Sequence, residues 1–214
     1  MASSTKQDIL SKLRKSRPKD SAQSPEPQPS SPPGAPFNDF AQFKQLLEQN
    51  HAEIHETTET ELHEAIMQWI KKSDITEHIS VSEHPELLQL KQSLDASAEL
   101  IDLSELDKNT LFNNVEVSIC YAELGIADKG ALLVEASAYQ PRTLSLVPPT
   151  NILVLHRYNI LSDLSSAFAS PRFSTTTLPS NIILISGPSK TADIQQTLAY
   201  GAHGPKQLVV FVIS

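Results

Sequence analysis

Three uninterrupted apolar runs in the second half of the chain restrict its fold more than any other feature. They read NILVLH at 151–156, NIILIS at 181–186 and QLVVFVI at 207–213. Runs of this length without polar alternation are typical of strands that are covered on both faces, as in a parallel sheet. We therefore expect an α/β protein with an open, mostly parallel sheet and flanking helices.

The segment before these runs alternates between helical and strand patterns, as the crossover connections of a parallel sheet require. Apolar residues at helical spacing predict helices at 37–47 and 62–70. Short apolar runs predict strands at 52–56, 78–81 and 98–103. The order strand, helix, strand continues the α/β pattern.

The middle of the chain carries a further strand and a turn. Alternating apolar residues predict a strand over 115–121, and two glycines then bracket a hairpin-like excursion that ends near residue 134. Helices are predicted at about 160–169 and 191–200. The second of these helices separates the last two apolar runs.

The first 36 residues differ from the rest in composition. Residues 1–15 favour a short helix, which either frays in isolation or docks on a partner. Residues 16–36 are rich in proline and serine and have no large apolar residue, so we expect a disordered linker. The expected α/β domain then occupies residues 37–214.

Charge and hydropathy exclude some classes of protein. A net charge of −8 and a pI near 5.3 argue against a broad electrostatic nucleic-acid surface. No apolar run approaches the length of a membrane span, and the N-terminus has no apolar core of the signal-peptide type. We expect a cytoplasmic protein without a membrane span or a nucleic-acid partner.

The residues that bind metals and redox cofactors are scarce. Cys120 is the single cysteine, so this chain cannot ligate an iron–sulfur cluster alone. Neither an HExxH nor a CxxC motif is present, and no GxGxxG fingerprint indicates a dinucleotide site. We expect no metal site and no cofactor bound by this chain, so that redox metal chemistry belongs to a partner.

The strongest candidate for a ligand site is the segment SGPSKTAD at 186–193, between an apolar run and a predicted helix. The backbone N–H groups and the dipole of a helix N-terminus favour an anion. Ordinary helix capping explains the same pattern, and the spacing of a Walker A loop is absent. The candidate anion-binding residues here are Ser186, Gly187, Ser189, Lys190, Thr191 and Asp193.

Two further loops carry candidate catalytic groups. His203, next to Gly204 in the sequence GAHGP, is placed either to bind an anion or shuttle a proton, or to stabilise a turn. Glu123 and Asp128 lie in the loop ELGIADKG, which ends at Gly130, and both Gly130 and Gly204 are further candidate substrate-binding positions. Each carboxylate is a candidate base or nucleophile, with a solvated loop acid as the alternative.

Arg142 is a candidate anion clamp, because a guanidinium binds a carboxylate or phosphate through two parallel hydrogen bonds. A surface ion pair is the alternative for this residue. We expect the loops at 125–130, 186–193 and 201–205 to converge at one end of the sheet.

Taken together, three segments resemble the LUD domain family, that of the lactate utilization C proteins. They are GIADKGALLVEAS at 125–137, RTLSLVPPTNILVL at 142–155 and ISGPSKTADIQQTLAYGAHGPKQLVVFVI at 185–213. The resemblance is close over 120–214 and looser over 37–214. It departs at Ala131, where many members have threonine, so no hydroxyl role is carried over to that position.

The resemblance implies a fold like that of ribose-phosphate isomerases, sugar-phosphate deaminases and CoA transferases. It also implies a role in the oxidation of L-lactate to pyruvate together with two iron–sulfur lactate utilization proteins. The leading hypothesis is therefore a substrate-handling or accessory subunit of such a system, with iron–sulfur clusters in the partners and a small anion as ligand (lactate, pyruvate or a phosphate-like group). The alternatives are a stand-alone enzyme on a phosphorylated sugar or CoA ester, and an anion-binding scaffold without turnover.

Overall fold

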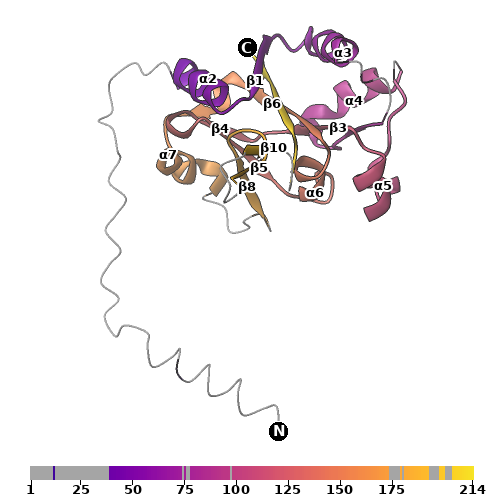
Figure 1. Ribbon diagram of the computed structural model, residues 1–214. Helices are drawn as coiled ribbons and strands as arrows, with labels where there is room; N and C mark the ends of the chain where they lie inside the picture. The colour runs from indigo at the N-terminus through magenta and orange to yellow at the C-terminus, as the bar shows by residue number, and fades with distance from the viewer. Residues whose placement is uncertain are drawn as a thin grey trace. The chain divides into compact units, whose positions relative to one another are not determined.

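The computed structural model describes Lys12 and residues 39–214, apart from 74, 76–77, 97, 174–178, 180, 193–197 and 201–203. The chain divides into two units, Met1–Pro32 and Pro33–Ser214 (Figure 1). Apart from Lys12, every described residue belongs to the second unit. The helix predicted within 1–15, except for Lys12, and the linker predicted at 16–36 lie outside the described residues.

A five-stranded sheet forms the centre of the second unit. Every neighbouring pair of its strands is parallel, which confirms the predicted fold class. The runs at 151–156 and 207–213 form the two longest strands, which lie side by side and are almost entirely buried. In spatial order the strands are β1 (Glu53–Thr57), β11 (Gln207–Ile213), β6 (Thr150–His156), β3 (Val117–Tyr121) and β2 (Ile79–Val81).

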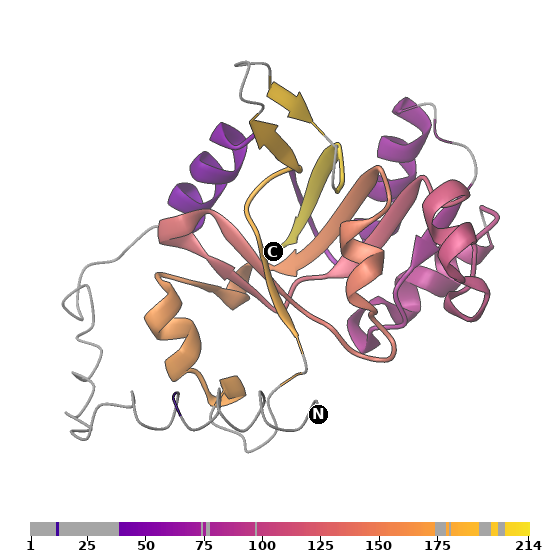
Figure 2. The same ribbon diagram turned by 60° about the horizontal axis from the view of Figure 1, so that its bottom comes forward.

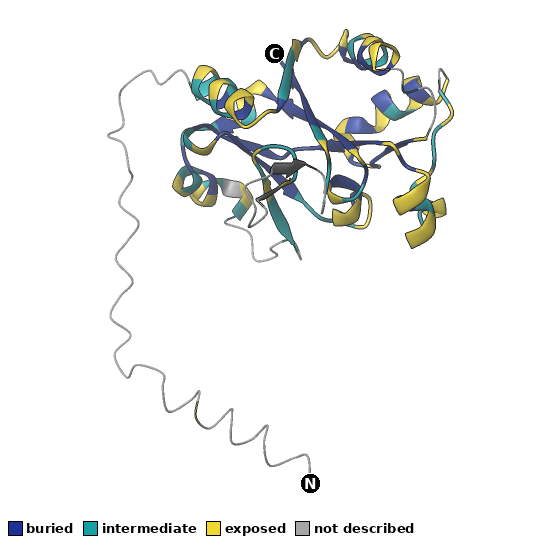
Figure 3. Cartoon of the chain, in the orientation of Figure 1, coloured by how far each residue is buried: buried dark blue, intermediate teal, exposed yellow. Residues whose placement is uncertain are grey.

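One face of this sheet is covered by two helices. These are α3 (Leu62–Lys72) and α4 (Leu88–Asp95), which follows directly on the short helix η1 (Pro85–Leu87). The apolar stripe of α3, which includes Trp69, packs on strand residues such as Phe211. In Figure 3 the buried residues line the sheet, and the exposed residues lie on the outer sides of the helices.

The other face is covered by further helices and by a second sheet. The helices are α2 (Asp39–Gln49), α5 (Lys108–Asn113) and α6 (Arg142–Leu146). The second sheet has the order β7 (Ile160–Leu161), β4 (Leu124–Ile126), β5 (Ala131–Glu135), β8 (Ile182–Ile185). Short helices η2 (Leu103–Glu105), η3 (Ala127–Lys129), η4 (Arg157–Asn159) and η5 (Pro171–Phe173) connect these elements.

The second sheet contributes to two cores because its side chains alternate between faces. Leu132 and Val134 of β5 pack in the core shared with the parallel sheet. Ala131 and Leu133 pack instead on α7 (Leu164–Ala169). Figure 2 shows the β4–β5 hairpin and α7 beside the parallel sheet. The predicted hairpin is confirmed, since β4 and β5 are antiparallel.

The apolar run at 181–186 was expected in the parallel sheet, and this expectation is wrong. The strand β8 within it is antiparallel to β5 and lies at an edge of the second sheet, with Leu184 49% exposed. An apolar run does not by itself distinguish a strand covered on both faces from an edge strand.

A helix was also predicted at about 191–200, but the described residues of this segment form strands. Residues Lys190–Ala192 form β9, which pairs in antiparallel fashion with β10 (Leu198–Tyr200). Strand pairing between the flanking segments has overridden the local helical preference.

Two smaller expectations also change. The run at 98–103 makes only an isolated bridge, between Leu100 and Ile79. The helix predicted at 160–169 is shorter, because Ile160–Leu161 is β7 and the helix begins at Leu164. The Asp163 carboxylate caps its start by accepting a 2.7 Å hydrogen bond from the Ser166 N–H. No described helix is long and apolar enough to cross a membrane.

Candidate functional site

A buried histidine and a buried glutamate meet just beyond the carboxyl ends of β2 and β3. His84 follows β2 by three residues, and Glu123 follows β3 by two. Their side chains are nearly inaccessible, and His84 Nε2 lies 2.9 Å from Glu123 Oε1. Ligands of open α/β sheets bind beyond the carboxyl ends of the strands, so the pair lies where a ligand is expected.

The neighbours of His84 fix its tautomer. Its Nδ1 atom accepts a hydrogen bond from the backbone N–H of Glu86 at 3.3 Å and so caps η1. Because Nδ1 is an acceptor, Nε2 carries the proton and donates to Glu123. The ring also stacks on Tyr121, with the two ring centroids 4.5 Å apart. His84 is therefore oriented as a donor to the Glu123 carboxylate.

Arg172, in η5, joins this pair to a second carboxylate. Its Nη2 lies 2.6 Å from Glu123 Oε2, and its Nε lies 2.6 Å from Glu135 Oε1. Burial acts to lower the pKa of the guanidinium, but the hydrogen bond to Glu135 and the charges of Glu123 and Glu135 outweigh it and raise that pKa. The cluster therefore places one guanidinium between two carboxyl groups, with His84 at the buried end.

These four residues line a cavity of about 280 Å³, which we call the carboxyl-edge pocket. Its other lining residues come from the segment after β5 and from Pro179. The Arg172 side chain is 40% exposed and is the cation on the pocket wall, whereas the Glu123 side chain is only 6% exposed. The pocket therefore combines one accessible guanidinium with a deeply placed carboxylate.

Gln140 holds the backbone around this pocket. The Gln140 side-chain oxygen accepts hydrogen bonds from Ser82 Oγ at 2.9 Å and from the Tyr121 N–H at 2.8 Å. Its amide nitrogen donates to the carbonyls of Tyr121, at 2.9 Å, and Glu135, at 3.3 Å. Gln140 is 1% exposed, so this buried amide ties together the segments that carry His84, Glu123 and Glu135.

Tyr121, the last residue of β3, adjoins the carboxyl-edge pocket through the stacking of its ring on His84. Burial, followed by the nearby charges of Glu86 and Glu123, raises the pKa of its phenol. Its hydroxyl accepts a 3.3 Å hydrogen bond from Asn159 Nδ2. Tyr121 is therefore a neutral group at ordinary pH and adds no charge to the pocket.

The other acid of the loop, Asp128, does not join Glu123, because the two lie at opposite ends of β4. Asp128 Oδ2 is paired with Lys129 Nζ at 2.8 Å, and the side chain is 34% exposed. Gly130 closes the same turn in the left-handed conformation, with φ of 52°, and a Cβ there would overlap Leu46. The left-handed backbone and the close approach of Leu46 together favour glycine at position 130, with no chemical role needed to explain it.

Of the three loops predicted to converge, the described parts of 186–193 and 201–205 do meet. They do so at the end of the sheet opposite to the carboxyl-edge pocket. Ser186, Gly187, Ser189 and Gly204 line a cavity of about 290 Å³, which we call the β8-end pocket. The Ser189 N–H donates to the Pro205 carbonyl at 2.8 Å. This pocket also contains the second residues of β6 and β11, so it lies at the amino ends of these strands.

Anion binding in the β8-end pocket was expected because a helix was predicted to begin near Thr191, but the structure has a strand at that position. Because β9 begins at Lys190, no helix N-terminus starts at Thr191 to offer its N–H groups. Lys190 is exposed, and nothing is described of the Thr191 side chain. Asp193 and His203 lie outside the described residues. Arg142 is exposed at the start of α6, the helix that contributes Ser145 and Leu146 to the pocket.

Sequence reasoning found Glu123 but missed the residues that complete the site around it, which are His84, Glu135, Gln140 and Arg172. His84 carried a usable signal, since it follows a predicted strand and precedes a proline that opens a helix. The other three lie on segments whose approach to Glu123 depends on the packing of the second sheet. Among the described residues, no group of three or more His, Cys, Asp or Glu side chains is placed to hold a metal ion.

Known proteins resemble this chain in structure and in sequence. A DUF162-family protein from Deinococcus radiodurans has a similar structure, with a TM-score of 0.60 at 20% identity, over 82% of this chain and 96% of that one. Lactate utilization protein C of Bacillus subtilis is 27% identical over 177 residues, which cover 77% of this chain and 73% of that protein.

An uncharacterized protein of Neisseria meningitidis serogroup B is 43% identical over 106 residues. These residues are 50% of this chain and 46% of that protein, so the match spans about half of the relative's length. The LUD domain family model matches residues 40–213, which include both sheets and the carboxyl-edge pocket. The chain therefore belongs to the LUD domain family.

Proposed function

We propose that this chain acts in lactate utilization, as a substrate-handling or accessory component of an iron–sulfur system that oxidises L-lactate to pyruvate. The observation that carries the proposal is the LUD domain match over 40–213, together with a relative named lactate utilization protein C that aligns with 77% of the chain. The single cysteine, Cys120, is fully buried, and burial raises the pKa of its thiol. One buried cysteine does not ligate a cluster alone, so we propose that the clusters belong to partners, which the resemblance implies are two iron–sulfur lactate utilization proteins.

The proposed ligand site is the carboxyl-edge pocket. A cavity of about 280 Å³ accommodates a three-carbon acid, and Arg172 supplies the planar donor pair that a carboxylate prefers. In the structure Glu135 accepts these two hydrogen bonds. Its Oε1 lies 2.6 Å from Arg172 Nε, and its Oε2 lies 3.1 Å from Arg172 Nη2. A substrate carboxylate would replace Glu135 there. The His84–Glu123 pair would then face the hydroxyl or keto oxygen of the substrate.

Growth on lactate tests this proposal. A deletion strain is complemented with the wild-type chain, with Arg172→Met, or with Arg157→Met as the control. Arg157 is an exposed arginine that lies over the Phe40 ring, outside the pocket. We expect the wild type and the control to restore growth and Arg172→Met to fail while still copurifying with both iron–sulfur proteins. Normal growth of the deletion strain, with no association with either protein, would contradict the proposal.

A second candidate is a stand-alone enzyme acting on a phosphorylated sugar or a CoA ester. The buried Glu123 carboxylate, held at its two oxygens by His84 and Arg172, favours this reading because such a group is suited to act as a base or nucleophile. Turnover by the purified chain, abolished in Glu123→Gln, would support an enzyme. Binding of the same compounds without turnover would instead support an anion-binding scaffold.

A further inference from the structure

The two carboxylates that hold Arg172 in the carboxyl-edge pocket differ in how firmly they are fixed. The Glu123 side chain is 6% exposed, and its second oxygen, Oε1, lies 2.9 Å from His84 Nε2. The Glu135 side chain is 17% exposed, and within the described part of the chain its carboxylate has no hydrogen-bond or ion-pair partner besides Arg172. Glu123 is therefore the fixed anchor of the guanidinium, and Glu135 is the carboxylate that can leave it.

Glu135 takes the place on the guanidinium that a bound acid would take. It accepts one hydrogen bond from Arg172 Nε and a second from Arg172 Nη2, one on each carboxylate oxygen. Two hydrogen bonds of this kind are the arrangement in which arginine binds a carboxylate most strongly. The Glu135 side chain is itself a carboxylate on a short carbon chain, so it indicates which ligand chemistry fits this edge of Arg172.

The backbone of Glu135 does not have to move when its side chain leaves Arg172. Glu135 is the last residue of β5 and lies opposite Ile182 of β8. Its carbonyl accepts a 3.3 Å hydrogen bond from Gln140 Nε2, and the N–H of the next residue, Ala136, donates to the Asn181 carbonyl at 3.0 Å. The departure of Glu135 is therefore a change of side-chain rotamer at the pocket wall, with both sheets left intact.

We propose that Glu135 is an internal competitor of the substrate carboxylate and so sets the affinity of the carboxyl-edge pocket for acids. In the free protein Glu135 occupies Arg172, and when an acid binds, the Glu135 side chain turns away while Glu123 keeps the guanidinium in place. An acid then binds only to the fraction of molecules that Glu135 has left, and the apparent dissociation constant is the intrinsic one divided by that fraction. This inference rests on the proposed function, because it takes Arg172 as the group that binds the carboxylate of the ligand.

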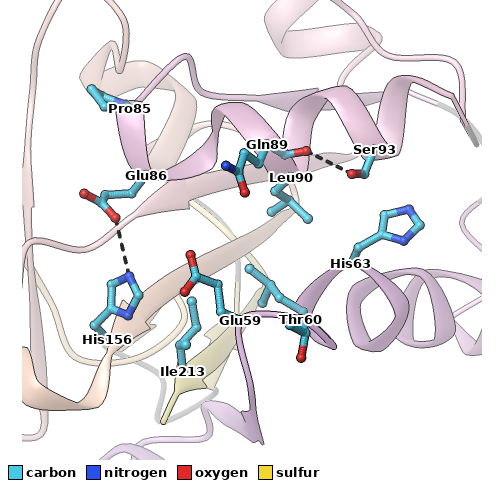
Figure 4. Close-up of a pocket in the computed structure, with 11 residues that line it drawn as sticks. Glu59, Thr60, His63, Pro85, Glu86, Gln89, Leu90, Ser93, His156 and Ile213 are labelled. Atoms are coloured by element: carbon cyan, nitrogen blue, oxygen red, sulfur yellow. Dashed lines mark hydrogen bonds and ion pairs between the residues drawn. The ribbon is translucent and has the colours of Figure 1, made fainter.

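A glutamate in a cavity does not by itself have this role. A cavity of about 390 Å³ between α3 and α4 (Figure 4) is lined by Glu59 and Glu86, and no lysine or arginine is among the described residues that line it. In Figure 4 the Glu86 side chain points toward His156, and Glu86 Oε2 lies 3.4 Å from His156 Nε2. These carboxylates have no guanidinium to occupy, so Glu59→Gln is the matched control for the loss of one carboxylate.

Propionate titrations of the full chain, followed by amide NMR shifts at constant ionic strength, test the proposal. Propionate has the carboxylate of lactate without its hydroxyl group, so it reports on the guanidinium alone. We expect Glu135→Gln to lower the dissociation constant for propionate about tenfold, the gain that follows if Glu135 holds Arg172 about nine-tenths of the time. Glu135→Asp, whose carboxylate is one carbon shorter, should lower it less. Glu59→Gln should leave it unchanged, and adding Arg172→Met to Glu135→Gln should remove the gain.

The proposal is overturned if Glu135→Gln binds propionate no more tightly than the wild type, or if neither protein binds it. It is also overturned if Glu59→Gln produces the same gain, because the effect would then be one of overall charge. The amide spectrum shows whether each variant is folded, and if Glu135→Gln is not, an unchanged affinity in Glu135→Asp overturns the proposal. Failure of the proposed function is seen separately: normal growth of the deletion strain on lactate would contradict that function and leave the effect of Glu135 on propionate binding as it is.

Discussion

The carboxyl-edge pocket and the β8-end pocket are built in opposite ways. In the first, side chains from four separate segments interlock: His84 and Arg172 each hold one oxygen of Glu123, and Gln140 ties the backbone behind them. In the second, backbone approaches backbone. A Cβ at Gly187 would come within 2.6 Å of the Asn50 carbonyl oxygen, and the Ser189 N–H bonds the Pro205 carbonyl.

The difference shows that the segments most easily recognised in the sequence are not those with the most developed charged site. The glycines of SGPSK and GPK permit close packing at the β8-end pocket. The charged residues of the carboxyl-edge pocket do not belong to a common sequence motif. They are brought together only when the chain folds. The predictions below therefore probe side-chain contacts in one pocket and steric fit in the other.

The largest effect is expected for Gln140→Leu. This change leaves the Tyr121 N–H, the Tyr121 and Glu135 carbonyls and Ser82 Oγ without their buried partner. The free energy of unfolding, measured by urea denaturation, should fall by more than about 3 kcal/mol. Gln68→Leu, at an exposed position of α3, should change it by less than about 0.5 kcal/mol. A loss below 1 kcal/mol at Gln140, roughly the net value of one hydrogen bond, would show that the amide does not hold the pocket together.

Gly187→Ala should come next, because the new methyl group meets backbone rather than a flexible side chain. Overpacking of this kind costs about 2 kcal/mol in the free energy of unfolding. Gly204→Ala is the milder comparison, since its Cβ would lie 3.1 Å from the Ser189 side chain, and about 1 kcal/mol or less is expected. Equal stability of the Gly187→Ala protein and the wild type would remove the steric account of the β8-end pocket.

Glu123→Gln keeps the shape of the side chain and removes its charge. Arg172 retains Glu135 and is 40% exposed, so the loss should be only about 1–2 kcal/mol, below that of a fully buried pair. A double-mutant cycle with Arg172→Met measures the coupling directly. Additive losses in that cycle would mean that the 2.6 Å contact contributes no net stability.

The smallest effect concerns pH and lies outside both pockets. The Asp107 carboxylate caps α5 by accepting a 2.7 Å hydrogen bond from the Thr110 N–H, which holds the pKa of Asp107 below its usual value of 3.8. A depressed folded pKa means that the stabilisation is present above pH 3.8 and is lost as pH falls through the lower value. The wild type should therefore exceed Asp107→Asn slightly in melting temperature at pH 6. The gap should close toward pH 3, and a constant gap would contradict the prediction.

The central strands were predictable because burial on both faces leaves a direct mark on the sequence. The runs that became β6 and β11 contain no polar break between Ile152 and Leu155 or between Leu208 and Ile213. The edge strand β8 has the same composition, and only its pairing with β5 reveals its place. The β9–β10 pair was missed because contacts between strands outweighed local preference.

The site was predictable only in part, for a related reason. Glu123 follows a strand and so could be named from the sequence, but His84 lies 39 residues before it. Gln140 reaches Ser82 across 58 residues and Arg172 reaches Glu135 across 37. Residues that act through such distant contacts have no fixed spacing in the chain, and their partnership appears only once both sheets are packed.

The most direct test of this account is a lactate titration of the purified chain, followed by its melting temperature, with Arg172→Met and Lys190→Gln compared side by side. A ligand that binds only the native state raises the melting temperature, so each variant shows whether the substituted residue contributes to binding. We predict a saturable rise in the wild type that Lys190→Gln preserves and Arg172→Met abolishes. A rise that survives Arg172→Met and disappears in Lys190→Gln would place the ligand near the start of β9, away from the carboxyl-edge pocket, and contradict the account.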